Sequence, residues 1–323
     1  MTGDTAAVPA RAEILRELAE GLGRPQKEIQ PKYFYDARGS ALFEEITRLP
    51  EYYLTRTERA LLERWMPTWI GALRPRSLVE LGAGSAAKTR IILDAMHQTG
   101  EAEVYAPVDV SEEFLAETSG RVRREYMEMQ VIPVVADISA AFHLPEALPR
   151  PTLHALLGST LGNFAPAAAA ALLGRMRGEM EASDRLLLGV DLRKDPARVE
   201  AAYNDARGVT AEFNRNALRV LNRQTGANFI PEAFEHRAFY NSEEHRIEMH
   251  LVSSRLQRVR VPRLGTFRLA EGESIRTEIS CKHDRESISA LFADAGLTVD
   301  EWETDEEGAY ALVLGAGVKG PTR

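Results

Sequence analysis

The central part of the chain alternates short apolar runs with stretches in which apolar residues recur at helical spacing. The helical stretches lie at 87–98, directly after Ser111, and at 166–181. Strands separated by helices predict an α/β fold with a parallel, doubly wound sheet. The runs that predict its strands are SLVELGAG (77–84), EVYAPVDVS (103–111), VIPVVAD (131–137), LHALLGST (153–160) and RLLLGVDL (185–192).

The C-terminal part of the chain returns to this pattern and then closes it. A helical stretch at 287–296, stopped by Gly296, precedes apolar runs at 297–304 and 308–317. Two strands joined by a short turn pair antiparallel. We therefore expect a terminal antiparallel hairpin at the edge of the sheet.

Other segments do not follow this alternation of predicted strands and helices. Residues 197–224, which follow Pro196, have the spacing of one long helix, whereas 236–254 and 265–280 alternate with the period of antiparallel strands. Residues 31–58 are dense in aromatic and charged side chains and fit neither period, so we expect a loop-rich element there. The predicted domains are an α/β domain at 61–191 and 284–323, and a second, α+β lobe at 1–60 and 192–283.

Composition limits the possible classes of function. The 323 residues include 40 Lys and Arg against 48 Asp and Glu, and this net charge of -8 argues against nucleic-acid binding. Cys281 is the one cysteine, which excludes an intramolecular disulfide, and no histidines have metal-ligand spacing. The N-terminal stretch lacks the pattern of a signal peptide, and the apolar runs are too short to span a bilayer. We expect a cytoplasmic monomer with a small-molecule substrate and no metal.

The first apolar run ends in the glycine-rich sequence ELGAGS, and an aspartate ends each of the next two runs. Gly82 and Gly84 allow the backbone to turn sharply and to approach a ligand closely. Asp109 stands where a carboxylate accepts hydrogen bonds from ribose hydroxyls, and Asp137 stands where one can accept from an adenine amino group. Lys88 can meet a ligand carboxylate. This set predicts S-adenosylmethionine, which joins adenosine to an amino acid.

NAD is the competing ligand. Its fingerprint, G-x-G-x-x-G, requires a third glycine where this chain has Ala87. The chain also closes with a hairpin and has no second nucleotide-binding half. Parallel strands followed by a terminal antiparallel hairpin are the layout of class I methyltransferases, and this layout favours a methyl donor over a hydride donor.

One aromatic segment, FYDARGSALFEEITRLPEYYLTRTE, is far more distinctive than a glycine loop. Together with four other stretches, it resembles the histidine-specific Nα-methyltransferases that open ergothioneine biosynthesis. The resemblance implies a class I methyltransferase with a second substrate lobe. It also implies that three methyl groups pass from S-adenosylmethionine to the α-amino nitrogen of L-histidine, giving hercynine. The matching stretches are PKYFYDARGSALFEEITRLPEYYLTRTE (31–58), LVELGAGSAAKTR (78–90), PVDVSEEFL (107–115), GSTLGNF (158–164) and RTEISCKH (276–283).

The resemblance further implies that histidine binds between the methyltransferase domain and the second lobe. Asn163 and Tyr203 would hold its carboxylate, Glu278 and Ser280 would hold its imidazole, and Met249 would pack against the ring. A buried carboxylate left unpaired costs on the order of 1–3 kcal/mol, so Glu278 would reject apolar side chains. The Asn163 amide has two N–H donors for a carboxylate, so it would select an amino acid over a plain amine.

Aromatic and apolar side chains complete the implied site. Tyr35 would lie near the amine, and a tyrosine of the PEYY motif would line the pocket. Counting from FYD favours Tyr52, but Tyr53 is adjacent and the sequence does not separate the two. Tyr35, Tyr52 and Glu278 are the candidates for catalytic roles, although no dedicated base is evident. Ile138 would pack against the adenine.

Two alternatives stay open. Altered neighbours of Glu278 and Met249 could shift the preference to another amino acid, such as tryptophan or tyrosine. The alternative from another class is a catalytically silent protein that binds S-adenosylmethionine. Such a protein has no need of the acceptor residues, all of which are present here.

Overall fold

The computed structural model describes residues 11–146 and 148–318, and these residues divide into two compact units. Unit 1 comprises residues 54–193 and 281–318, and unit 2 comprises residues 11–53 and 194–280. The chain therefore passes between the units after Tyr53, Arg193 and Ser280. Within the described ranges, no helix is long and apolar enough to cross a membrane.

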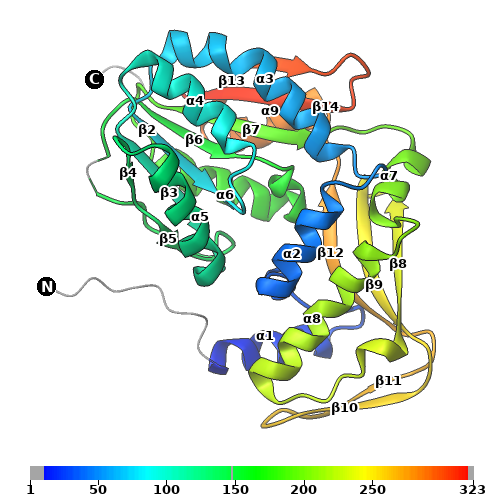
Figure 1. The fold of residues 1–323 in the computed structure, drawn as a ribbon. Coiled ribbons are helices and arrows are strands. Elements are labelled where there is room, and N and C mark those ends of the chain that lie inside the picture. The colour runs from blue at the N-terminus through cyan, green and yellow to red at the C-terminus, as the bar shows by residue number, and fades with distance from the viewer. Residues whose placement is uncertain (1–10, 147, 319–323) are drawn as a thin grey trace, which may run out of the picture. The chain divides into compact units, whose positions relative to one another are not determined.

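Unit 1 is built on one mixed sheet with the strand order β13-β14-β7-β6-β2-β3-β4, and β5 also pairs with β3 (Figure 1). The strands from β7 through β4 and β5 are parallel, whereas β14 is antiparallel to both β7 and β13. The predicted doubly wound sheet with a terminal hairpin is confirmed. Its strands are β2 (Ser77–Leu81), β3 (Val104–Asp109), β4 (Gln130–Val131), β5 (Val134–Val135), β6 (Thr152–Leu156), β7 (Arg185–Asp191), β13 (Leu297–Thr304) and β14 (Tyr310–Gly317).

Helices cover both faces of this sheet (Figure 1). On one face, α3 packs beside α4 and against β14, and on the other α6 packs beside α9. Leu188 of the sheet, Leu172 of α6 and Phe292 of α9 are fully buried in one apolar core. This core fixes the carboxyl ends of the parallel strands, where the predicted cofactor residues lie. The helices are α3 (Leu54–Leu73), α4 (Thr89–Thr99), α5 (Glu112–Glu125), α6 (Pro166–Gly178), α9 (Arg285–Asp294) and the 3-10 helix η2 (Thr160–Asn163).

Unit 2 combines helices with a sheet of strand order β1-β12-β9-β8 and a two-stranded hairpin, β10-β11. The long helix α8 packs against β8 and β9 and also contacts α2. Its buried face includes Phe213, Ala217 and Leu221. The elements are α1 (Arg11–Gly23), β1 (Lys27–Glu28), η1 (Pro31–Phe34), α2 (Ala37–Ile46), α7 (Pro196–Tyr203), α8 (Val209–Thr225), η3 (Pro231–Ala233), β8 (Phe234–Asn241), β9 (Arg246–Ser253), β10 (Gln257–Val261), β11 (Gly265–Leu269) and β12 (Ser274–Cys281).

Three sequence-based expectations about local structure were wrong. Residues 197–224 form two helices rather than one, because Asp205 accepts the first free N–H groups of α8 and Gly208 turns the backbone at φ +72°. Residues 31–58 are mostly helical rather than loop-rich, and Asp36 caps α2 by accepting from Gly39 N at 2.7 Å. In addition, the third predicted strand is split into β4 and β5.

Candidate functional site

The glycine loop follows β2 and carries the backbone through a left-handed conformation three times. Gly82 has φ +72°, Gly84 has φ +52° and Ala86 has φ +53°. A non-glycine residue in this region costs roughly 1–2 kcal/mol and persists where the surroundings enforce it, often at a binding site. Gly82 N donates to Val108 O at 2.8 Å, which fixes the loop against the end of β3.

Asp109 lies at the end of β3, as predicted, and is bound to the glycine loop. Its carboxylate accepts from Gly84 N at 3.0 Å and from Ser111 N at 3.1 Å. Burial raises the pKa of Asp109, and the hydrogen bonds from the backbone of Ser111 and Gly84 oppose that shift. A carboxylate offers about four lone-pair sites. Asp109 therefore retains acceptor capacity for further hydrogen bonds, and its role in binding a ribose stays a prediction.

Asp137 and Ile138 follow β5 at the same edge of the sheet. Asp137 accepts from Ser139 N at 2.9 Å and from Ser139 Oγ at 2.5 Å, so it shapes the turn after the strand. Ile138 is half-buried against the core, and its carbonyl accepts from Arg175 at 2.9 Å. The structure thus brings the three successive strand ends with Gly82, Asp109 and Asp137 to one edge of unit 1, as the sequence predicts for parallel strands.

Lys88 ends the glycine loop, and its ammonium is paired with the carboxylate of Glu58 on α3. Glu58 is completely buried, and sequence reasoning missed it because a glutamate in a helix is ordinarily solvated. A second missed carboxylate, Glu80 of β2, accepts from Thr89 at 2.8 Å and from Tyr105 at 2.7 Å. Burial raises the pKa of Glu80 to about 7. Both residues stood inside matched motifs, TRTE and ELGAG, which was the available signal.

Asn163 is the last residue of the 3-10 helix η2, which follows β6. The segment that leads to it turns at Gly158 and Ser159, which have φ +73° and φ +59°. A Cβ at Gly162 would lie 2.8 Å from the carbonyl oxygen of Cys281, closer than side-chain carbons approach. Gly162 therefore lets η2 pack directly on the Cys281 backbone. GSTLGNF is a tightly fixed loop in unit 1, and a role for Asn163 in substrate binding stays a prediction.

Four of the predicted acceptor residues are neighbours within unit 2. The Tyr203 hydroxyl at the end of α7 donates to Ser280 Oγ at 2.9 Å, and both residues are buried. The Tyr52 ring lies 6.4 Å from the Tyr203 ring in an edge-to-face arrangement. Glu278 lies two residues before Ser280 on β12, and alternate residues of a strand share a face. Residues from three distant parts of the sequence thus converge here.

The other predicted residues of unit 2 lie around this group. Met249 is buried on β9, and its carbonyl accepts from Thr277 Oγ1 of β12 at 3.1 Å, one residue before Glu278. The Tyr35 ring packs edge-to-face on Phe43 and on Phe213 of α8. The contacts of Tyr35 and Met249 with a substrate stay predictions.

Tyr52 and Tyr53, which the sequence could not separate, have different surroundings. The Tyr53 hydroxyl accepts from Lys194 Nζ at 2.9 Å, and the Lys194 and Arg198 cations lie 4.9 Å and 4.8 Å from its ring centroid. Tyr52 instead packs among aromatic rings, including Tyr203. The neighbourhood of Tyr203 therefore favours Tyr52 as the tyrosine of the acceptor group.

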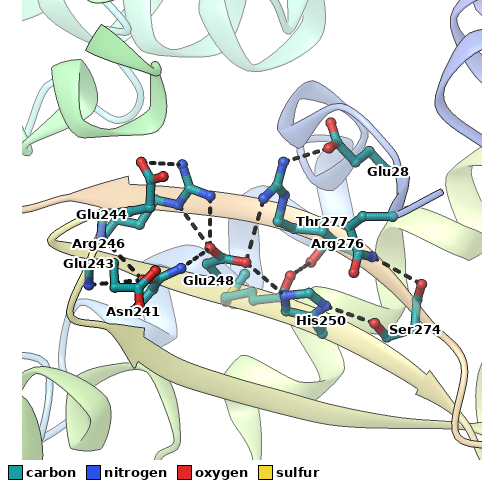
Figure 2. Close-up of polar contacts among 12 residues, drawn as sticks. Glu28, Asn241, Glu243, Glu244, Arg246, Glu248, His250, Ser274, Arg276 and Thr277 are labelled. Atoms are coloured by element: carbon teal, nitrogen blue, oxygen red, sulfur yellow. Dashed lines mark hydrogen bonds and ion pairs between the residues drawn. The ribbon is translucent and has the colours of Figure 1, made fainter. Parts of the chain in front are cut away.

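Figure 2 shows a charged network on the sheet of unit 2 that the sequence did not indicate. Glu248 accepts from Arg246 at 2.8 Å, and Arg276 joins Glu248, at 3.5 Å, to Glu28. Hydrogen bonds from Arg246, Asn241 and His250 outweigh the effect of burial and lower the pKa of Glu248 to about 2. The network links β1, β12 and β9, and β12 is the strand that carries Glu278 and Ser280.

Two solved structures share this fold. A S-adenosylmethionine-dependent methyltransferase from Clostridium acetobutylicum aligns with a TM-score of 0.50 at 10% identity, over 86% of this chain and 98% of that one. Magnesium protoporphyrin IX methyltransferase from Synechocystis aligns with a TM-score of 0.50 at 11% identity, over 89% and 98%. The fold is therefore that of the class I S-adenosylmethionine-dependent methyltransferases.

The sequence comparisons identify a narrower group of proteins than the fold does. Residues 14–316 match the family described as histidine-specific, S-adenosylmethionine-dependent methyltransferases, and the chain belongs to this family. S-adenosylmethionine is accordingly its methyl donor. A histidine N-alpha-methyltransferase of Mycobacterium tuberculosis is 44% identical, over 94% of each chain, and one of Mycolicibacterium smegmatis is 42% identical, over 96% of each. An ergothioneine biosynthesis protein 1 of Neurospora crassa is 32% identical, over 89% of this chain and 33% of that protein.

Proposed function

We propose that this enzyme transfers three methyl groups in succession from S-adenosylmethionine to the α-amino nitrogen of L-histidine. The product would be hercynine, and the reaction would be the first step of ergothioneine biosynthesis. The family match and the relatives named for histidine methylation and ergothioneine biosynthesis support this proposal. We also infer a cytoplasmic, monomeric enzyme.

The observation that carries the proposal is the group formed by Tyr52, Tyr203 and Ser280. The Tyr203 hydroxyl is fixed by its bond to Ser280, and the Tyr52 ring packs beside it. Hydroxyl groups both donate and accept, so the group suits a zwitterionic ligand with a polar ring. Glu278, on the same strand as Ser280, supplies the carboxylate that an imidazole N–H needs.

On the cofactor side, Gly82, Gly84, Asp109, Asp137 and Ile138 would hold the adenosine part, and Lys88 the carboxylate of its amino acid end. When bound, S-adenosylmethionine supplies an electrophilic methyl group on a positively charged sulfur. The chain's own residues have to align the amine and exclude water, because alignment provides most of the rate in such a displacement. The ammonium form of the substrate must also lose a proton before attack, and Tyr35, Tyr52 and Glu278 are the groups we propose for holding or relaying it.

Incubation of the enzyme with S-adenosylmethionine and each amino acid in turn tests the proposal, with products read by mass spectrometry. We expect histidine to gain up to three methyl groups and tryptophan and tyrosine to react at no more than a small fraction of the histidine rate. Methylation of another amino acid instead would assign a different acceptor, and modification of none would favour a silent binding protein.

Histamine, which lacks the α-carboxylate, is the matched control for substrate recognition. Without that carboxylate, the Asn163 amide loses its proposed acceptor, at a cost on the order of 1–3 kcal/mol, and the amine is poorly aligned. We expect kcat/KM to fall more than about a thousandfold relative to histidine. Comparable turnover of the two amines would show that the enzyme does not recognise the α-carboxylate of its substrate.

A further inference from the structure

Glu58 is unusual among the carboxylates of helix α3. It lies in the second turn of the helix and is completely buried, whereas Glu63 on the same helix has a side chain 56% exposed and pairs with Arg59 at 3.5 Å. Removing a carboxylate from water costs several kcal/mol unless charged or hydrogen-bonding partners replace the water. The partners of Glu58 therefore indicate why it is there.

Those partners come from three separate parts of unit 1. Oε1 of Glu58 accepts from Gly158 N at 2.7 Å and from the Tyr310 hydroxyl at 2.7 Å, and Oε2 pairs with the ammonium of Lys88. The sheet leaves room for this carboxylate at Gly189 of β7, where any Cβ would collide with Oε1. The carboxylate of Glu58 is thus enclosed by β7, the start of β14, the loop after β6 and the glycine loop.

Lys88 is the partner of Glu58 that we propose to bind the cofactor. It follows the glycine loop directly and precedes α4, and its side chain is 19% exposed. A lysine side chain is long and flexible, so an unrestrained ammonium loses conformational entropy when it binds a ligand. The ammonium has three donors. Glu58 accepts from it, and the remaining capacity can serve a ligand anion.

We propose that Glu58 is a positioning residue for the cofactor: it holds the Lys88 ammonium so that Lys88 binds the carboxylate at the amino acid end of S-adenosylmethionine. The proposal rests on the methyl donor assigned above, and Glu58 acts through Lys88 rather than by touching the cofactor. Because the effect concerns the carboxylate alone, recognition of the adenosine part does not depend on Glu58.

Two probes separate this role from a general structural one. S-adenosylhomocysteine has the amino acid end, whereas 5′-methylthioadenosine has the same adenosine part without it. For Glu58→Gln, we expect calorimetry to show S-adenosylhomocysteine binding weakened by at least about tenfold, or about 1.4 kcal/mol. Binding of 5′-methylthioadenosine, measured by competition, should change less than about twofold. Glu63→Gln, the same change on the exposed side of the helix, should alter neither.

Equal weakening of both probes by Glu58→Gln, or no weakening of either, would overturn the proposal. Failure of the unaltered enzyme to bind S-adenosylhomocysteine would instead refute the methyl-donor assignment, so the two failures are distinguishable.

A double-mutant cycle tests whether Glu58 acts through Lys88. We expect Lys88→Met and the double variant with Glu58→Gln to bind S-adenosylhomocysteine with equal affinity, because no ammonium remains to be positioned. Lys88→Met leaves a buried carboxylate without its cation, so binding is measured at a temperature at which circular dichroism shows all variants folded. The double variant removes both charges and avoids that cost. A further tenfold loss on adding Glu58→Gln to Lys88→Met would overturn the proposal.

Discussion

Two buried glutamates, one in each unit, have pKa values displaced in opposite directions. Glu80 in unit 1 has hydroxyl partners, Thr89 and Tyr105, and burial raises its pKa to about 7. Burial also acts to raise the pKa of Glu248 in unit 2, but hydrogen bonds from its partners, led by Arg246, lower it to about 2. Both residues are largely shielded from solvent, at 3% and 6% exposure, but hydroxyl groups surround Glu80 and arginines surround Glu248.

The two units therefore place carboxylates of different character near their proposed binding residues. The sheet of unit 2 carries the carboxylate of Glu248, paired with Arg246 on the same strand and with Arg276 on the neighbouring strand β12 (Figure 2). This pairing suits a strand that must present Glu278 and Ser280 in one geometry. The glycine loop of unit 1 lies beside a carboxylate that changes charge near neutral pH. Replacing each of these glutamates by glutamine tests the comparison directly.

Glu248→Gln should cause the largest loss of stability. A carboxyl pKa lowered from 4.5 to about 2 corresponds to about 3 kcal/mol of folding free energy. Because the folded pKa lies below the unfolded one, this contribution is present above about pH 4.5 and is lost as the pH falls toward 2. Chemical denaturation at pH 7 should show the loss, and the difference between variant and parent should shrink at pH 3.

Glu244→Gln is the matched control for that experiment. Glu244 is 55% exposed and pairs with the same Arg246 at 3.5 Å. An exposed ion pair contributes about 0–1 kcal/mol, so we expect a change below about 0.5 kcal/mol. Equal effects of the two substitutions would show that the partners of Glu248 do not set its contribution.

Glu80→Gln should act in the opposite direction and raise stability by up to about 3 kcal/mol at pH 8. The folded pKa of Glu80 is raised from 4.5 to about 7, so its favourable contribution is complete below pH 4.5 and is lost as the pH rises through 7. A neutral glutamine mimics the protonated form at every pH. We expect a higher thermal unfolding midpoint than the parent at pH 8 and a similar one at pH 5. The same difference at both pH values would mean that Glu80 does not titrate in this range.

Asp109→Ala should weaken S-adenosylhomocysteine binding by about 1–3 kcal/mol, through lost hydrogen bonds to a charged acceptor. Calorimetric titration measures the change, and histidine affinity serves as the comparison in unit 2. Unchanged cofactor affinity would remove Asp109 from the proposed site.

The fold of unit 1 was largely predictable because its signals are local. Each parallel strand is a short apolar run, and the closing hairpin follows from two runs joined by a turn. The break at 204–208 was missed because it depends on Asp205 and Gly208 acting together at one helix end. The helix α2 was missed because its aromatic side chain, Phe43, packs on Phe213, which is far along the chain.

The sequence predicted site residues only where they lie in recognisable motifs. Asp109 and Asp137 lie where parallel strands place them. Glu58 was not found, because its partners Gly158 and Tyr310 are 100 and 252 residues away, and helical spacing says nothing about them. Tyr52 and Tyr53 are adjacent, so only their tertiary contacts separate them.

The claim that unit 2 reads the imidazole while unit 1 holds the cofactor is tested most directly by Glu278→Ala. With this variant, kcat/KM for histidine should fall at least about tenfold, the equivalent of one hydrogen bond of about 1.4 kcal/mol. Any residual activity toward tryptophan should fall less, and S-adenosylhomocysteine affinity should be unchanged. An equal fall for both acceptors, or a parallel loss of cofactor affinity, would contradict the assignment and make Glu278 a structural residue.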